Sequence, residues 1–297
     1  MIRLDLHFEL DYLIDSPSGD FVFNIQPAQT AAQRVLQEQI VVTPEVPWRS
    51  DTLAGSRNRL LRVRAPQGNF HLTYTASVTI DHRIGDPVSI EETPVDELPS
   101  ECLCYLAPSR YCESDRLVQW ADAEFGHLPP GYARAAAIAR WVQRHIAYSA
   151  FGSTTQTSAL DTLTDRVGVC RDQAHVMIAL CRALSMPARY VTGTDYGADP
   201  TKAPDFHAYV EVYLGRRWYT FDASGTGIPM GFVRIGTGRD AADVPFATLF
   251  GQVQAPFAPL VRATACGGSG LQLPVDVGLA LSTDGDSAGL HIAPVAA

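Results

Sequence analysis

The sequence predicts an α+β protein in which a small, sandwich-like all-β domain precedes a core of helices and antiparallel strands. Three observations lead to this class. Apolar and polar residues alternate from residue 2 to about residue 82. Helical spacing replaces this alternation after about residue 110. Strand-like segments then return from Ala188 onward.

The first region contains segments in which every second residue is apolar. Residues 3–10 and 70–80 follow this pattern closely, and residues 59–64 follow it imperfectly. Turn-forming residues separate these segments at 16–19 and at 66–69. Because each strand has one apolar face, a second layer must cover that face. We therefore expect a small antiparallel sandwich.

A linker rich in proline and acidic residues occupies 83–110 and leads into a helical region. A helix is expected over 132–146, where apolar residues recur at helical spacing. Another helix is expected over 170–185, because Pro187 prevents it from continuing. Residues 176–180 make this helix apolar nearly all round, so we expect it to be buried on most sides.

Strands are expected again at 189–193, 206–214 and 217–222. Further strand-like segments fill residues 226–297, and we expect them to pack on the core. The chain thus divides into an N-terminal β-sandwich-like domain at 1–82, a linker at 83–110, a core at 111–225 and C-terminal strands at 226–297.

Composition limits the classes of function. The chain has 297 residues and a net charge of -9, which argues against a phosphate-binding surface and so against nucleic acid as a partner. No apolar run approaches the roughly 20 residues that a membrane helix needs, so no membrane partner is expected. The first residues alternate charge with apolar side chains, unlike the apolar centre of a signal peptide. The cytoplasm is therefore the expected location.

The six cysteines match neither a disulfide framework nor a zinc motif. One residue separates Cys102 from Cys104, instead of the about two to four residues of a zinc knuckle, and no second pair follows. Free and mostly buried thiols are expected, with no metal and no cofactor. The sequence leaves the oligomeric state open.

Three residues stand out by their chemistry and their order along the chain: Cys170, His207 and Asp222. A thiol, an imidazole and a carboxylate can act as nucleophile, base and orienting group in acyl transfer. If a two-residue turn at Leu214–Gly215 joins the last two strands, His207 lies directly across from Asp222. The opposite face of this hairpin is then apolar and suited to a core.

Cys170 is expected in the first turn of its helix. Free backbone N–H groups and the helix dipole favour a thiolate there, and the N–H of Cys170 can stabilise an oxyanion. A second donor is required, and Tyr148, Gln156 and Trp218 are unranked candidates for this contact with the substrate. His175 lies on a different face of the helix, so we expect it to serve packing or a hydrogen bond.

A charged segment flanked by glycine follows the core at Gly238-Arg239-Asp240. Arg239 is a candidate for the rim of the cleft, where it would hold polar groups of the substrate. A solvated turn with a local ion pair is an equally good interpretation, and the sequence leaves both open.

These residues resemble the transglutaminase-like superfamily, in particular bacterial members of the cysteine-protease type. The core of the resemblance lies at 168–172, 206–212 and 218–224. Residues 105–115 and 238–244 resemble segments that flank the core in those proteins. An N-terminal β-domain similar to the first region of this chain also accompanies the family.

The resemblance implies a papain- or transglutaminase-like core, with the cysteine helix packed on an antiparallel sheet. It implies that Cys170 is the nucleophile, His207 the base and acid, and Asp222 the orienting carboxylate. It does not fix the reaction, because members include cross-linking transferases, proteases, amidases and inactive relatives. We expect a cysteine-peptidase-like amide hydrolase that acts on a protein or peptide through a thioester. A protein-glutamine transglutaminase and a non-catalytic binding module stay open as alternatives.

Overall fold

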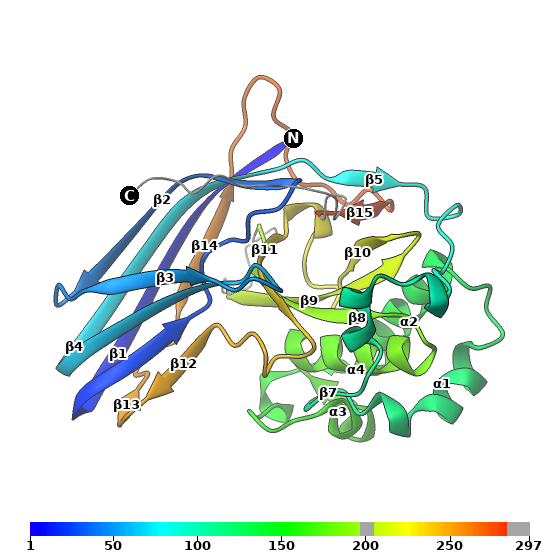
Figure 1. The fold of residues 1–297 in the computed structure, drawn as a ribbon, viewed down its shortest axis with the longest axis horizontal. Helices are drawn as coiled ribbons and strands as arrows, with labels where there is room; N and C mark the ends of the chain where they lie inside the picture. The colour runs from blue at the N-terminus through cyan, green and yellow to red at the C-terminus, as the bar shows by residue number, and fades with distance from the viewer. Residues whose placement is uncertain (197–204, 284–297) are drawn as a thin grey trace.

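Two long strands dominate the N-terminal part of the chain (Figure 1). The computed structural model describes residues 1–196 and 205–283. In it, β1 (Ile2–Phe23) and β4 (Arg59–Ile80) are each 22 residues long and pair antiparallel along most of their length. Buried positions alternate with more exposed ones along β1, as the sequence pattern predicts, so this sheet has one apolar face.

Shorter strands extend this sheet on both sides. On one side, β2 and β3 pair with β4, and on the other side β12, β13 and β14 pair with β1. Their bounds are Gln33–Thr43 (β2), Trp48–Thr52 (β3), Ala247–Phe250 (β12), Val253–Gln254 (β13) and Leu260–Ala265 (β14).

The position of β12, β13 and β14 differs from the expectation that residues 226–297 pack on the core. These segments are too short for their alternation to identify a partner. The long strand β1 would otherwise present a free edge, and unpaired edges are usually covered in native proteins. The division of the chain into four parts stays a prediction, and the described residues of its last part contribute to three sheets.

The layer on the apolar face of the first sheet also differs from a sandwich. In the described part of the chain, Met230, Val233 and Ile235 of the core join the hydrophobic cluster formed by β1 and β4. Alternation shows that a face is buried, but it does not identify the layer that covers it.

The core is a second sheet with helices against one face (Figure 1). Its strands are antiparallel and lie in the order β10-β9-β8-β11. The strands are β8 (Ala188–Thr194), β9 (Phe206–Leu214), β10 (Arg217–Phe221) and β11 (Val233–Gly238), and the helices are α1 (Val118–Phe125), α2 (Tyr132–His145), α3 (Ala159–Asp165) and α4 (Cys170–Ala183).

Helix α4 is the centre of the core. Residues 176–181 have no exposed surface, in agreement with the sequence pattern. Ala208, Val210 and Val212 of β9 lie in the same cluster, so the predicted apolar face of the hairpin is confirmed. Short elements complete the fold: the strands β5 (Arg83–Gly85), β6 (Ala147–Tyr148), β7 (Val167–Gly168) and β15 (Ala280–Ser282), and the 3₁₀ turns η1 (Val95–Glu97), η2 (Ser100–Tyr105), η3 (Ser114–Arg116), η4 (Ala150–Gly152) and η5 (Pro229–Gly231).

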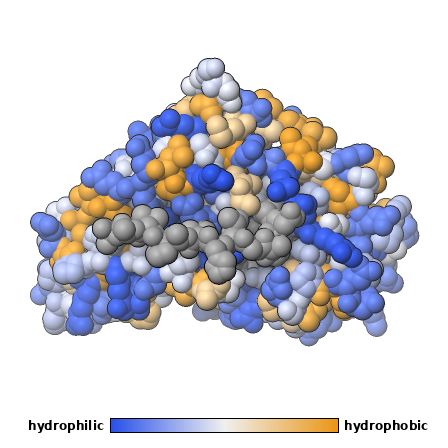
Figure 2. Space-filling view, turned by 45° about the horizontal axis from the view of Figure 1, so that its top comes forward, coloured by the Kyte–Doolittle hydropathy of each residue, from blue (hydrophilic) through white to orange (hydrophobic). Residues whose placement is uncertain are grey.

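The helices in the described ranges are all too short or too polar to cross a bilayer. On the face shown in Figure 2, hydrophilic and hydrophobic residues are intermixed.

Candidate active site

Cys170 is the first residue of α4, and local contacts fix the start of that helix. The backbone N–H of Val169 donates to the buried carboxylate of Asp172 at 3.0 Å. Arg171 donates to the same carboxylate from Nε at 3.0 Å. Gly168 allows this arrangement, because a Cβ at that position would lie only 2.7 Å from the Cβ of Asp172. The sequence around the cysteine therefore builds a rigid helix start.

His207 and Asp222 come from the hairpin of β9 and β10, but its register differs from the predicted one. The turn consists of Gly215 and Arg216, with φ values of +50° and +65°. This conformation matches the tight turns that suit a two-residue hairpin. Leu214 stays in the strand because its side chain is fully buried in the core.

The observed pairing places Thr220 opposite Glu211, which is a shift of two residues from the predicted register. His207 and Asp222 are therefore diagonal neighbours and do not lie directly across from each other. A shift of two keeps both side chains on one face of the hairpin, because side chains alternate with a period of two. The Nε2 atom of His207 still lies 3.4 Å from Oδ1 of Asp222.

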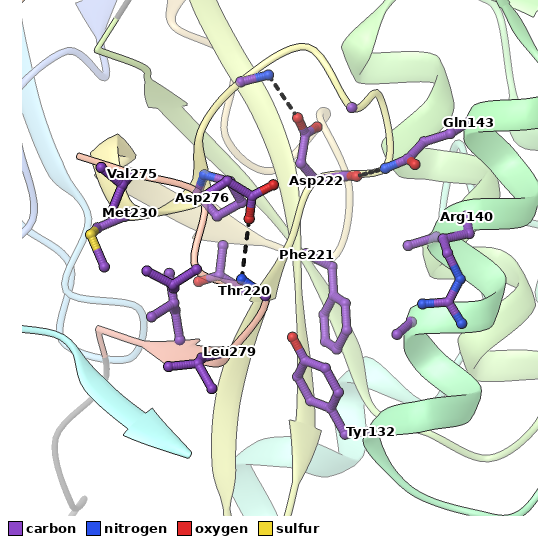
Figure 3. A pocket seen from close by; sticks show the side chains of 18 residues that line it. Tyr132, Arg140, Gln143, Thr220, Phe221, Asp222, Met230, Val275, Asp276 and Leu279 are labelled. Carbon is purple, nitrogen blue, oxygen red and sulfur yellow. Dashed lines mark hydrogen bonds between the residues drawn. The ribbon is translucent and has the colours of Figure 1, made fainter. Parts of the chain in front are cut away.

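Asp222 is held by its own loop and by α2 (Figure 3). Its Oδ1 accepts a hydrogen bond from Oγ of Ser224 at 2.7 Å, and its Oδ2 accepts one from the backbone N–H of Gly227 at 2.9 Å. The side-chain amide of Gln143 donates to the backbone carbonyl of Asp222 at 2.7 Å. A cavity of about 410 Å³ adjoins this loop, but neither Cys170 nor His207 lines it, so it is separate from the thiol.

The ionisation of His207 and Asp222 is strongly coupled. Burial on its own lowers the pKa of an imidazole. The hydrogen bonds and charges of Asp222 and Cys170 outweigh burial, however, and raise the pKa of His207 well above its usual value. Burial likewise raises the pKa of a carboxyl, but contacts with His207, Ser224 and Gly227 lower the pKa of Asp222 to about 2. His207 is therefore an imidazolium that lies between the carboxylate of Asp222 and the thiol of Cys170.

The thiol of Cys170 has two polar neighbours. One is His207 and the other is Tyr148, which lies on β6 beside the start of α4. Burial first, and the charge of Cys170 second, raise the pKa of Tyr148 to about 12, so its hydroxyl keeps its proton. The thiol is itself partly exposed, which leaves it open to a ligand.

Models of two known families match successive parts of the chain. The model for the transglutaminase-like superfamily matches residues 119–223, and the model for the bacterial transglutaminase N-terminal domain matches residues 2–101. The crystal structure of a "putative cysteine protease" from Cytophaga hutchinsonii is 36% identical, with a TM-score of 0.86. The match covers 95% of this chain and 97% of that chain.

The chain belongs to the transglutaminase-like superfamily.

The fold of this superfamily is the α+β arrangement that the sequence predicts. More distant relatives also match over most of their length. An uncharacterized protein of Mycobacterium leprae is 24% identical, over 82% of this chain and 91% of its own length. An uncharacterized protein of Mycobacterium tuberculosis is 23% identical, over 74% of this chain and 78% of its own length.

The four other candidate residues of this transglutaminase-like chain lie in different places. Tyr148 adjoins the thiol. Gln156 lies exposed in the loop after β6, and its backbone N–H donates to Thr154. Trp218 is buried against Tyr105, with the guanidinium of Arg189 stacked at 4.1 Å from its ring centre. Trp218 precedes Asp222 by four residues, or ~13 Å along a strand, which does not support a contact with substrate at the thiol.

Arg239 forms a local ion pair with Asp243, with Nε 2.9 Å from Oδ2. Its backbone carbonyl accepts a hydrogen bond from Arg182, near the end of α4 opposite Cys170. Of the two interpretations left open by the sequence, the structure favours the local turn. His175 packs between Tyr111 and Tyr190, as expected, and burial lowers its pKa to about 3.

Several supporting residues were missed from the sequence. Ser224 follows Asp222 by two residues, and an aspartate followed by serine at this spacing is a signal for a side-chain-stabilised turn. Gln143 had no such signal, because its contact with Asp222 spans 79 residues of chain.

Proposed function

We propose that this protein is a thiol-dependent amide hydrolase or acyl transferase, and foremost a cysteine-peptidase-like hydrolase. The observation that carries the proposal is the contact of Cys170, at the start of α4, with a His207 that is paired to Asp222. The Cytophaga hutchinsonii relative, described as a "putative cysteine protease", supports the hydrolase side of the proposal.

In the proposed mechanism, the thiolate of Cys170 attacks an amide carbonyl, and the C–N bond breaks as His207 gives its proton to the leaving amine. This leaves a thioester. Neutral His207 then takes a proton from water, which attacks the thioester. This releases the carboxylic acid and the thiolate of Cys170, so the thiolate and the His207 imidazolium are restored. The backbone N–H of Cys170 and the hydroxyl of Tyr148 are the proposed donors to the oxyanion.

The same thioester reacts with a primary amine in a transferase, so the products decide between the two reactions. We would incubate the protein with a denatured glutamine-rich protein and a labelled primary amine. Peptide fragments identify a peptidase, ammonia without label identifies a glutamine amidase, and incorporated label identifies a transglutaminase. Cys104→Ala is the matched control for Cys170→Ala, because Cys104 is an exposed thiol outside the site.

No product of any of these kinds, from a folded preparation, would contradict the proposal and favour a binding module. The cytoplasm is the proposed location, because Cys104 is an exposed free thiol and Cys170 a partly exposed one, and free thiols persist in reducing compartments. Fractionation of the native host tests the location.

A further inference from the structure

An acidic residue lies close to the proposed catalytic histidine. Asp205 directly precedes β9, which begins at Phe206, and it stands two residues before His207. Residues two apart on a strand point to the same side and lie about 7 Å apart, so Asp205 and His207 share one side of β9. The Oδ1 of Asp205 accepts the backbone N–H of Phe206 at 2.7 Å. No cationic side chain in the described ranges forms an ion pair with Asp205.

The aromatic side chain of Tyr148 adjoins the thiol from β6. Tyr148 contacts Cys170, and the charge of Asp205 contributes to its raised pKa, so this carboxylate lies near the partly exposed thiol and tyrosine. Tyr148 is 54% exposed, and Phe151, three residues later, is fully exposed. The backbone N–H of Ser149 donates to the carbonyl of Gly168 at 2.9 Å, which ties this segment to the start of α4.

The other charges near the thiol are already balanced. Arg171 is paired with the buried Asp172 and also donates to Oγ of Ser153 at 2.8 Å. Asp222 is paired with His207. Asp205 is attracted to the imidazolium of His207 but forms no ion pair with a cation in the described ranges, so its charge is available to a ligand near the thiol.

We propose that Asp205 and Tyr148 form a subsite for a positively charged group, an ammonium or a guanidinium, next to the carbonyl that Cys170 attacks. A carboxylate attracts such a group, and aromatic rings bind both its charge and the apolar stem of a lysine or arginine side chain. This inference rests on the proposed function, because it takes Cys170 as the reacting group. It makes basic peptides, or amines, the preferred ligands.

Charged thiol reagents test the subsite without any turnover. The cationic 2-aminoethyl and the anionic 2-sulfonatoethyl methanethiosulfonates each transfer their thioalkyl group to a thiolate, with release of methanesulfinate. We would measure both rate constants at Cys170 at pH 8 and low salt, by peptide mass spectrometry. Asp205→Asn should lower the cation-to-anion rate ratio about threefold to tenfold, as expected for the loss of one charge near the thiol in a largely aqueous environment.

Asp20→Asn is the matched control, because Asp20 is an exposed aspartate on β1 in the other sheet. The cation-to-anion rate ratio of Asp20→Asn should equal that of the wild type. An unchanged ratio in Asp205→Asn, or an equal change in Asp20→Asn, overturns the subsite. If Cys170 reacts no faster than the exposed Cys104 with either reagent, the proposed nucleophile fails instead, so the two failures are distinguishable.

The positive group can belong to the acyl donor or to an incoming amine, and turnover separates these sources. If it belongs to the donor, Asp205→Asn should lower kcat/KM about threefold or more for a peptide with lysine beside the reacting amide, and not for its glutamate counterpart. If it belongs to the amine, the variant should raise the KM for the amine and leave the donor KM unchanged. If Asp205→Asn and the wild type have equal kinetic constants both for the donor peptides and for the amine, the proposal is overturned.

Discussion

The two antiparallel sheets of this protein bury their strands in different ways. Along β1, buried positions alternate with more exposed ones, so charged side chains of the N-terminal sheet reach water. In the core sheet, every residue of β8 and all but the first residue of β9 are buried. A strand covered on both faces has no position where a charged side chain is solvated, so every such residue needs a partner.

The partners in the core sheet are specific. Glu211 is fully buried and accepts a hydrogen bond from Nε of Arg189 at 2.7 Å, with Arg234 at 3.6 Å. His207 and Asp222 form the second buried pair. In the N-terminal sheet, by contrast, Asp51 and Arg62 form an exposed pair. The core sheet thus holds buried ion pairs, whereas the pair of Asp51 and Arg62 in the N-terminal sheet stays in contact with water.

Removing a thiol should produce the largest difference in turnover between a change in the core and a change in the N-terminal sheet. Cys170→Ala should reduce turnover to background, because no nucleophile remains, with little change in the free energy of unfolding. Cys266→Ala, beside β14 in the other sheet, should leave turnover unchanged. Product formation and urea unfolding of both variants check this. Turnover that survives in Cys170→Ala would show that another group carries the reaction.

Removal of a charge in the proposed triad should have the next largest effect. Asp222→Asn keeps the size of the side chain but removes the charge that stabilises the His207 imidazolium. We expect kcat to fall about 10²–10⁴-fold, by analogy with other triads. Asp51→Asn in the N-terminal sheet should leave kcat unchanged. Equal kcat values for Asp222→Asn and the wild type would remove Asp222 from the mechanism.

The buried ion pair should matter for stability more than the exposed one. Glu211→Ala removes the carboxylate that neutralises Arg189, and breaking a buried pair in this way costs about 3–5 kcal/mol. Asp51→Ala should cost less than about 1 kcal/mol. Urea unfolding measures both. If the two losses are similar, burial does not distinguish the sheets energetically.

Asp222 should contribute to the pH dependence of stability. A carboxyl with a pKa of 3.8 when unfolded and about 2 when folded stabilises the fold above the unfolded value. This stabilisation is lost as the pH falls through the folded pKa. The shift corresponds to about 2 kcal/mol. The difference in unfolding free energy between the wild type and Asp222→Asn should therefore shrink by about this amount between pH 5 and pH 2.

Urea unfolding at several pH values measures that difference. Arg62→Ala, which alters the N-terminal sheet and removes no acid, is the control. A constant difference between the wild type and Asp222→Asn over this range would mean that the pKa of Asp222 is the same in both states.

The sequence predicted those features that depend on local pattern. The alternation in β1 and β4, the apolar helix α4 and the apolar face of Ala208, Val210 and Val212 were all visible in single segments. Cys170, His207 and Asp222 were found because their types and order fit one kind of chemistry.

Features that depend on tertiary contacts between segments could not be predicted from the pattern of a single segment. The hairpin register was wrong by two residues because the burial of Leu214 decided where the turn begins. The partner of β14 and the support of Asp222 by Gln143 both join segments that are far apart in the chain. Trp218 was a reasonable cleft candidate, and only the structure shows that it packs edge-to-face against Tyr105.

The strand β1 also has a consequence for biosynthesis. One edge of β1 is completed by β12, β13 and β14, which lie far later in the chain, so β1 leaves the ribosome well before these partners are made. Contacts of such high sequence separation slow folding. Until these partners have been made, the nascent chain holds a long unsatisfied strand edge, which is the kind of surface that chaperones protect from aggregation.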